Sequence, residues 1–353
     1  MNATTLDLLT LALLPDVGPR AVRALRERGA LAELLREPRA HADLLPAAAL
    51  ERLAGGTARA AAERELAAAT RLGLRVVGLD EADYPAHLAR IFDPPAVLYV
   101  RGRLVADEGS RSVAVVGSRA ASPAGLALAR RLGQDLARAG LTVVSGLARG
   151  IDGAAHEGTL QAAGRTVAVL GSALDRPYPP EHAGLMRAIT ERGGAAVSEL
   201  PLGTGPSPAT FPRRNRLLAG WARAVVVVEA AERSGALITA RLALEEGREV
   251  LAVPGHPSFA GAGGANALIR DGAALVRHAG DVLAELGFEV QPRPAPAAPT
   301  DRVLAAMPAD APVSVDEIQR SSGQPLELVL ARLGQLELEG GVRRLPGALF
   351  LRN

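Results

Sequence analysis

Two short stretches of the sequence place an arginine in a glycine-containing turn directly after an apolar run. Arg119 ends the stretch VAVVGSR at 113–119, and Arg149 lies in SGLARGID at 145–152. A turn from a strand into a helix leaves backbone N–H groups unpaired, and the helix dipole adds partial positive charge there. An arginine adds a permanent, forked cation to such a turn. We therefore predict two phosphate sites, contacted by Gly117, Ser118, Arg119, Arg149 and Gly150.

A third cluster is the stretch FPRRNR at 211–216, which we expect to form a loop after a strand near 195–198. Arginines can hold phosphates, an aromatic ring can stack on a base, and an asparagine can bond a base edge or fix the loop. The alternative is a solvated run of charge. We favour a contact to single-stranded nucleic acid made by Phe211, Arg213, Arg214, Asn215 and Arg216.

A fourth candidate is Ser234 with Gly235, which open a helical pattern after the apolar run at 224–229. The hydroxyl and the N–H groups would suit an anion, although helix capping alone would explain the serine.

Catalytic and cofactor signatures are weak in this sequence. Asp152 and His156 are four residues apart, followed by Glu157, so the pair would share one helix face. An acid–base pair or half a metal site is one interpretation, and we favour a structural hydrogen bond between the two. The turn at 117–125 does not match G-x-G-x-x-G, and no acidic residue ends the run at 141–144. We expect no catalytic residue, no metal and no cofactor.

The elements that must position these residues follow from six apolar runs, at 113–116, 141–144, 166–170, 195–198, 224–229 and 249–253. Helical patterns separate most of them, for example at 124–139 and 236–247. Apolar strands alternating with helices predict a mostly parallel sheet covered on both faces. We therefore expect an α/β, Rossmann-like, doubly wound domain at 112–288, with the arginine turns at the carboxyl ends of its strands.

The flanks predict smaller modules. Residues 1–75 are helical in pattern, and LPDVGPR at 14–20 is similar to the turn of helix-hairpin-helix and SAM-like modules, or else is a plain packing turn. Residues 76–111 are expected to form an extension leading into the core, and 289–300 a Pro/Ala linker. Three helical patterns and a hairpin at 301–353 predict a winged-helix-like domain. Its third helix carries three glutamates and one arginine, which favours protein binding or packing over DNA insertion.

Composition narrows the chemistry further. The chain has 353 residues, is 48% hydrophobic and has a formal net charge of +2. It has no cysteine and no lysine, which excludes thiol catalysis and a Walker loop and leaves arginine as its phosphate-binding cation. The sequence shows no signal-peptide pattern and no bilayer-length apolar run, so we expect a cytoplasmic protein without a membrane partner.

The series of motifs resembles the DNA-processing protein A (DprA/Smf) family. The resemblance covers the central domain and is carried by VVGSR at 115–119, SGLARGID at 145–152 with His156, Tyr178-Pro179, Ser198-Glu199, FPRRNR at 211–216, Val228-Glu229, SGALIT at 234–239 and VPG at 253–255.

The resemblance implies a non-enzymatic protein that binds single-stranded DNA, protects incoming DNA and loads the RecA recombinase onto it in natural transformation. It also implies a homodimer formed through the Rossmann-like domain. Its DNA contacts would fall on Ser118, Arg119, Arg149, Phe211 and residues 213–216. Two alternatives are a hydrolase of nucleoside monophosphates and a pure scaffold. The hydrolase group carries a Pro-Gly-Gly-x-Gly-Thr turn, where this chain reads EAAERSGA at 229–236.

Overall fold

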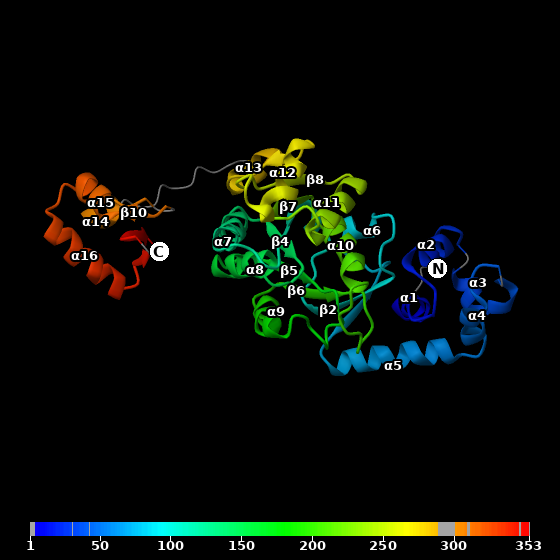
Figure 1. The fold of residues 1–353 in the computed structure, drawn as a ribbon. Helices are drawn as coiled ribbons and strands as arrows, with labels where there is room; N and C mark the ends of the chain where they lie inside the picture. Colours follow the sequence, from blue (N-terminus) through cyan, green and yellow to red (C-terminus); the bar gives the residue numbers. More distant parts are fainter. Residues whose placement is uncertain are drawn as a thin grey trace. The chain divides into compact units, whose positions relative to one another are not determined.

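A computed structural model describes residues 4–29, 31–41, 43–288, 301–308, 311–345 and 347–352 (Figure 1). The chain divides into two compact units, Met1–Val290 and Gln291–Asn353, which are described separately below. The predicted Pro/Ala linker at 289–300 lies outside the described residues.

The larger unit is built on a sheet with the strand order β1-β2-β6-β5-β4-β3-β7-β8-β9. Its parallel strands are β3 (Ser112–Gly117), β4 (Thr142–Ser145), β5 (Thr166–Val169), β6 (Ala195–Ser198), β7 (Ala224–Val228), β8 (Glu249–Ala252) and β9 (Ala274–Leu275). The chain adds β4, β5 and β6 on one side of β3 and then returns to place β7 on the other side. The predicted doubly wound sheet is confirmed, and its order reverses between β3 and β7.

The segment expected as an extension is part of this sheet. Strands β1 (Arg75–Gly78) and β2 (Val97–Gly102) pair antiparallel with each other, and β2 pairs antiparallel with β6. Residues 76–111 therefore complete one edge of the sheet instead of merely leading into it.

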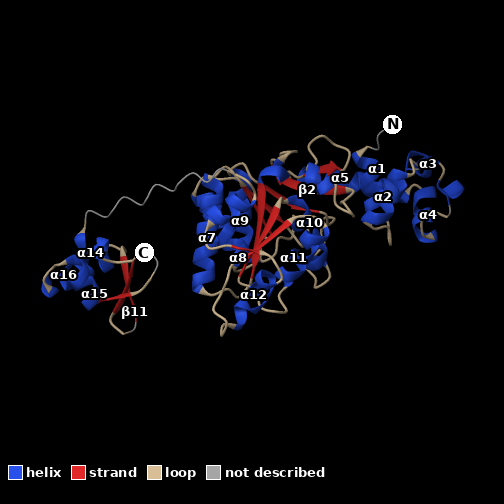
Figure 2. Ribbon diagram, turned by 90° about the horizontal axis from the view of Figure 1, so that it is seen from above, coloured by secondary structure: helices blue, strands red, loops and turns tan. Residues whose placement is uncertain are grey.

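Helices cover both faces of the sheet, with α7 on one side and α10 and α11 on the other (Figure 2). Alternate residues of β3 show why, since Val113 and Val115 belong to one apolar cluster and Ala114 and Val116 to another. The helices of the core are α7 (Pro123–Arg138), α8 (Ile151–Gln161), α9 (Ala183–Glu191), α10 (Thr210–Trp221), α11 (Gly235–Glu245), α12 (Gly263–Arg270) and α13 (Ala279–Glu285).

The N-terminal helices pack against the β1–β2 edge, where Leu8 of α1 is fully buried together with Val77 and Leu98. They are α1 (Thr5–Ala12), α2 (Pro19–Glu27), α3 (Leu31–Arg36), α4 (Ala47–Ala54) and α5 (Thr57–Arg71), followed by the short α6 (Ala86–Ala89). This segment is therefore mostly helical from Thr5 to Arg71, and it belongs to the same compact unit as the core.

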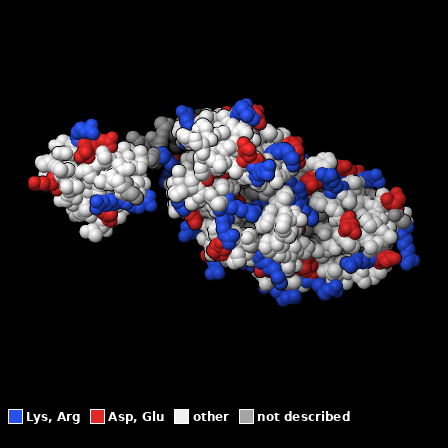
Figure 3. All heavy atoms as spheres, in the orientation of Figure 1, with Lys and Arg blue, Asp and Glu red and all other residues white. Residues whose placement is uncertain are grey.

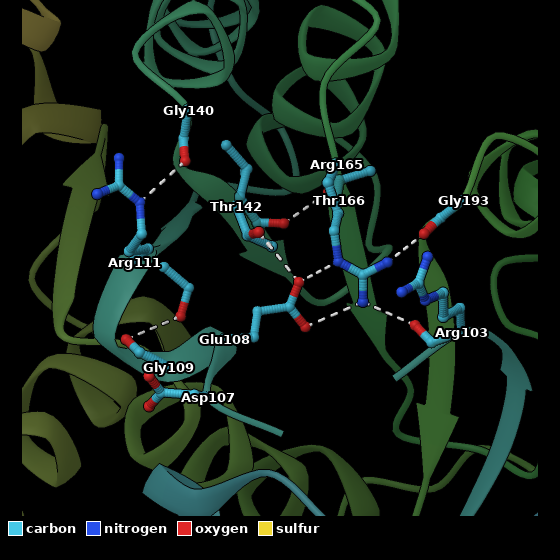
Figure 4. Close-up of polar contacts among 12 residues, drawn as sticks. Arg103, Asp107, Glu108, Gly109, Arg111, Gly140, Thr142, Arg165, Thr166 and Gly193 are labelled. Carbon is cyan, nitrogen blue, oxygen red and sulfur yellow. Dashed lines mark hydrogen bonds and ion pairs between the residues drawn. The ribbon is translucent and has the colours of Figure 1, made fainter. Parts of the chain in front are cut away.

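A buried ion pair fixes the amino ends of the central strands (Figure 4). The Glu108 side chain is only 2% exposed and accepts hydrogen bonds from Thr142 Oγ1 at 3.0 Å and from Arg165 Nη2 at 3.1 Å. Arg165 also donates to the carbonyls of Arg103, at 2.7 Å, and Gly193. The pair joins the starts of β3 to β6, at the end of the sheet opposite the predicted phosphate sites.

The smaller unit has the predicted three helices and hairpin. Helices α14 (Arg302–Ala305), α15 (Val315–Ser322) and α16 (Leu326–Leu338) accompany strands β10 (Val313–Ser314), β11 (Val342–Leu345) and β12 (Leu349–Arg352). Its core includes Ile318, Val329 and Phe350. In neither unit is any described helix long and apolar enough to cross a bilayer.

Candidate nucleic-acid interface

A cleft of about 850 Å³ opens where the strand order reverses, at the carboxyl ends of β3 and β7. The turn after β3, the first turns of α10 and the turn before α11 meet there, together with Ala148, Asp152, Tyr178 and residues 206–208. Eight of the predicted contacts line the cleft: Gly117, Ser118, Arg119, Phe211, Arg214, Asn215, Ser234 and Gly235. The other four, Arg149, Gly150, Arg213 and Arg216, lie outside its lining.

Arg119 and Arg233 are the exposed arginines of the cleft lining. Arg119 forms no ion pair with a described carboxylate, although its charge opposes the rise in the pKa of the buried Asp152. Its guanidinium lies 4.6 Å from the ring centroid of Phe211, whose ring is 5.8 Å from that of Tyr178. A free guanidinium beside an accessible aromatic ring offers charge for a phosphate and a surface for a base.

Two glycines of the site are required by close backbone contacts. A Cβ atom on Gly117 would lie 1.9 Å from the Val228 carbonyl oxygen, so β3 and β7 approach each other too closely for any side chain there. Gly150 has a φ of +76°, and a Cβ atom there would lie 2.1 Å from the Ser118 carbonyl oxygen. Gly117 and Gly150 therefore hold the turns together and need not contact a ligand themselves.

Glu229 ties the turn after β7 to the turn after β3. Its carboxylate accepts hydrogen bonds from the Ser122 N–H at 2.8 Å and the Ser122 hydroxyl at 2.7 Å. Its backbone carbonyl accepts from the Ser118 N–H, and its φ is +55°. Sequence reasoning placed Glu229 only in the motif series and missed this positioning role, for which the acidic residue directly after an apolar strand was the available signal.

The stretch at 211–216 is a helix and not the predicted loop, since it forms the beginning of α10. Arg214 is 4% exposed and donates hydrogen bonds to the carbonyls of Gly146, at 2.6 Å, and Val169. Burial lowers the pKa of Arg214 to about 10, and the carboxylate of Asp152 opposes that shift. Arg214 therefore braces the ends of β4 and β5 from below the cleft, and its burial argues against the predicted phosphate contact.

The neighbouring arginines of α10 face a different surface. Arg216 is 8% exposed and pairs with Glu199, which also pairs with Arg213 at 3.0 Å. Arg213 remains half exposed, whereas Arg216 serves mainly the buried ion pair. Asn215 donates a hydrogen bond to the Gly235 carbonyl at 3.3 Å, so it fixes the turn before α11, one of its two predicted roles.

Asp152 and His156 have separate partners, so the predicted hydrogen bond between them is wrong. The buried Asp152 carboxylate accepts from the N–H groups of Gly146, at 3.1 Å, and Ala148, at 3.4 Å, which braces the turn after β4. His156 Nδ1 bonds Thr166 Oγ1 at 2.7 Å, and burial lowers the pKa of His156 to about 3. Among the described residues, no cluster of His, Asp and Glu is suited to a metal ion.

Arg149 and Ser234 occupy the turns next to the cleft. Arg149 is 53% exposed, and its Nε lies 2.5 Å from Glu181 Oε1, a contact that raises the pKa of Arg149. A phosphate would have to displace this carboxylate. Ser234 Oγ accepts from the Ala236 N–H at 3.2 Å, so it caps α11, as the alternative interpretation predicted.

Comparison with known proteins identifies the family. The family model described as DNA recombination-mediator protein A matches residues 75–287, and the DprA winged helix domain matches 289–348. The chain belongs to the DNA-processing protein A family. It is 42% identical to Protein Smf of Escherichia coli over 285 residues, which is 77% of this chain and 76% of that protein. Against DNA processing protein DprA of Streptococcus pneumoniae it is 44% identical over 205 residues, covering 58% and 72%.

Solved structures of the DNA-processing protein A family show the same fold. The X-ray structure of DprA from Streptococcus pneumoniae matches with a TM-score of 0.69 and 34% identity, covering 82% of this chain and all of that one. DNA processing protein A from Helicobacter pylori, whose structure is described for its single-stranded DNA binding mode, matches with a TM-score of 0.53 and 26% identity. That match covers 60% of this chain and 95% of the other.

Proposed function

We propose that this chain binds single-stranded DNA in the cleft between β3 and β7 and hands it to the RecA recombinase during natural transformation. One observation carries the proposal: Arg119, an exposed arginine that forms no ion pair with a described carboxylate, lies against the partly exposed ring of Phe211 at the strand-order reversal. The single-stranded DNA in the description of the Helicobacter pylori relative supports the same ligand class.

In this mechanism the DNA backbone supplies most of the affinity. Arg119 neutralises one phosphate and Arg149 exchanges Glu181 for a second, while Gly235, the first residue of α11, lines the cleft beside Arg119. Phe211 stacks on a base, which every base allows, so little sequence is read. The buried side chains of Asp152 and Arg214 keep the turns in place while the strand binds.

The charge distribution indicates that a few arginines, and not the net charge of the whole protein, would attract DNA. Acidic and basic side chains are interspersed over the visible face of each unit (Figure 3), and the formal net charge is only +2. Binding should therefore depend on a few direct phosphate contacts and weaken with salt in proportion to their number.

The experiment is a titration of a fluorescent oligothymidylate and of a matched duplex with wild-type protein, Arg119→Ala and Arg149→Ala. We expect Arg119→Ala to weaken single-strand binding about tenfold or more and to lower the salt slope by about 0.7, the value for one phosphate contact. Arg241→Ala is the matched control, because Arg241 is 71% exposed and lies outside the cleft lining. Unchanged binding by both site variants would overturn the assignment of the cleft.

We further propose that the Rossmann-like domain forms a homodimer, which would present two clefts to one strand and raise avidity. Two large apolar side chains on the surface of this domain are exposed, Leu244 at 59% and Leu275 at 44%. Light scattering of the wild type and of Leu244→Arg and Leu275→Arg tests this, and a wild-type monomer at micromolar concentration would refute it. RecA filament assembly on the bound strand, measured in parallel, tests the hand-over.

The hydrolase alternative finds less support in the geometry. The carboxylate of Glu229, in the segment that would hold the catalytic turn, is engaged by Ser122. Release of free base from nucleoside monophosphates would nevertheless revive this alternative.

A further inference from the structure

A second groove, of about 450 Å³, lies between the N-terminal helices and the core of the larger unit. One wall is the turn between α1 and α2 and the start of α2, the segment that resembles a nucleic-acid-binding hairpin. The other wall is formed by Asp93, in the loop before β2, and by two arginines of α10, Arg213 and Arg216. The lining residues are Gly18, Pro19, Arg20, Ala21, Asp93, Arg213 and Arg216.

The groove carries more cationic than anionic groups. Three arginines line it against one lining carboxylate, that of Asp93, which lies 3.5 Å from Arg216. The buried Glu199 pairs with both Arg213 and Arg216, so three cations stand against two carboxylates. Arg20 is exposed and has no acidic partner in the described parts of the chain. Arg216 is the decisive residue, because its side chain is only 9% exposed and its Nη1 atom has no hydrogen-bond partner among the described residues. A buried donor of this kind is rare without a partner, and an anion in the groove would provide an acceptor.

An exposed aromatic ring lies beside Arg20 and its neighbour on α2, Arg23. Phe92 is 60% exposed, and the guanidinium groups of Arg20 and Arg23 lie 4.9 and 5.6 Å from its ring centroid. Arg23 also donates to the Phe92 carbonyl at 2.6 Å, which fixes the backbone below the ring. A ring held in place with cations over it repeats the chemistry of Arg119 and Phe211 in the cleft.

The start of α2 adds a backbone contribution. Gly18 is its N-cap and supplies no side-chain hydrogen bond, and Pro19 occupies the first helical position. The positive end of the α2 dipole is therefore left without a carboxylate or hydroxyl cap, next to the groove.

Helix α10 connects the groove to the cleft. Phe211 and Asn215 line the cleft, whereas Arg213 and Arg216 of the same two turns line the groove. A ligand long enough to pass over the first turns of α10 can reach both surfaces, and a mononucleotide cannot.

We propose that this groove is a second binding site for the same single strand of nucleic acid, holding a phosphate among Arg20, Arg213 and Arg216 and a base on Phe92. This inference rests on the proposed function of the cleft. The N-terminal hairpin then lengthens the bound track instead of serving only as a packing module.

The test compares two oligothymidylates, of about five and about twenty nucleotides, which span the range of common single-strand site sizes. The variant Arg20→Ala/Phe92→Ala should bind the long oligonucleotide about tenfold more weakly than wild type, with a salt slope lower by about 0.7. Its affinity for the short oligonucleotide should stay within about twofold, because the cleft alone can hold that length. The control is Arg28→Ala, an exposed arginine at the C-cap of the same helix that does not line the groove.

Wild-type affinity of the double variant for the long oligonucleotide would overturn the proposal and leave a protein-docking role for Phe92. An equal loss of affinity for the short and the long oligonucleotide would also overturn it, because the substitutions would then have weakened binding in the cleft itself. If the wild type binds neither oligonucleotide, the proposed function itself fails, and the groove proposal fails with it. Thermal unfolding of each variant shows whether the fold is intact, which the exposure of Arg20 and Phe92 leads us to expect.

Discussion

Replacement of Arg214 separates a structural arginine from a ligand-binding one. In Arg214→Ala the carbonyls of Gly146 and Val169 lose a charged donor, and the buried carboxylate of Asp152 loses its nearby cation. A hydrogen bond to a charged group contributes about 1.5–3 kcal/mol, so two such bonds give about 3–6 kcal/mol. Removal of one partner of a buried charge pair costs about 3–5 kcal/mol. We therefore expect a loss of about 4 kcal/mol in the free energy of unfolding.

The assay is urea denaturation at neutral pH, supported by thermal unfolding, in which this loss corresponds to a decrease of about 10 °C in Tm for a domain of this size. Arg241→Ala is the control, because Arg241 is 71% exposed, its partner Glu245 is 59% exposed, and an exposed ion pair contributes at most about 1 kcal/mol. DNA titrations of both variants over a range of salt concentrations complete the comparison.

For Arg214→Ala we expect weaker DNA binding with an unchanged salt slope, because the turns shift but no phosphate contact is lost. The opposite result would refute the argument. If Arg214→Ala unfolds within about 1 kcal/mol of wild type and its salt slope falls by about 0.7, then Arg214 holds a phosphate directly.

Three further predictions concern other parts of the molecule. Glu108→Gln should lower the free energy of unfolding by about 3–5 kcal/mol in urea denaturation, since it leaves Arg165 buried without its carboxylate, while single-strand affinity stays at the wild-type value. The pKa of His156 is about 3 in the fold and about 6.5 when unfolded, so the unfolded state takes up the proton first as the pH falls. Protonation of His156 in the unfolded state should therefore lower the free energy of unfolding of the wild type by about 2 kcal/mol between pH 7 and pH 5. Urea denaturation of His156→Gln at the two pH values should not show this loss. Deletion of residues 301–353 should leave the affinity of the larger unit for the short oligonucleotide within about twofold of wild type, and a large loss would place a DNA contact in the winged helix.

The sheet could be predicted from the sequence because Val- and Ala-rich runs separated by amphipathic helices have few other solutions. Which side chains of α10 are buried could not be predicted from the sequence. Phe211-Pro212 and three arginines read as a polar loop, yet the helical period turns Arg214 inward and leaves Arg213 outward. Burial of the Arg214 guanidinium depends on the carbonyls of Val169, 45 residues earlier in the sequence, and of Gly146, 68 residues earlier. No local sequence pattern reveals contacts at these separations.

The same limit applies to the edge of the sheet and to Glu229. The strands β1 and β2 are short apolar runs around a Pro-rich loop, and only the pairing of β2 with β6 shows that they belong to the core. The role of Glu229 depends on a hydrogen bond to Ser122, more than a hundred residues earlier in the chain. In both cases a distant partner decides the role.

The Glu108–Arg165 pair lies at the amino ends of the strands, and the cleft lies at their carboxyl ends. Substitutions far apart and without shared partners have nearly additive effects on stability. The turns proposed to touch DNA can therefore diverge during evolution, or be randomised in a library, while the opposite end maintains the fold. A relative with altered ligand preference should keep the buried pair and vary around Arg119.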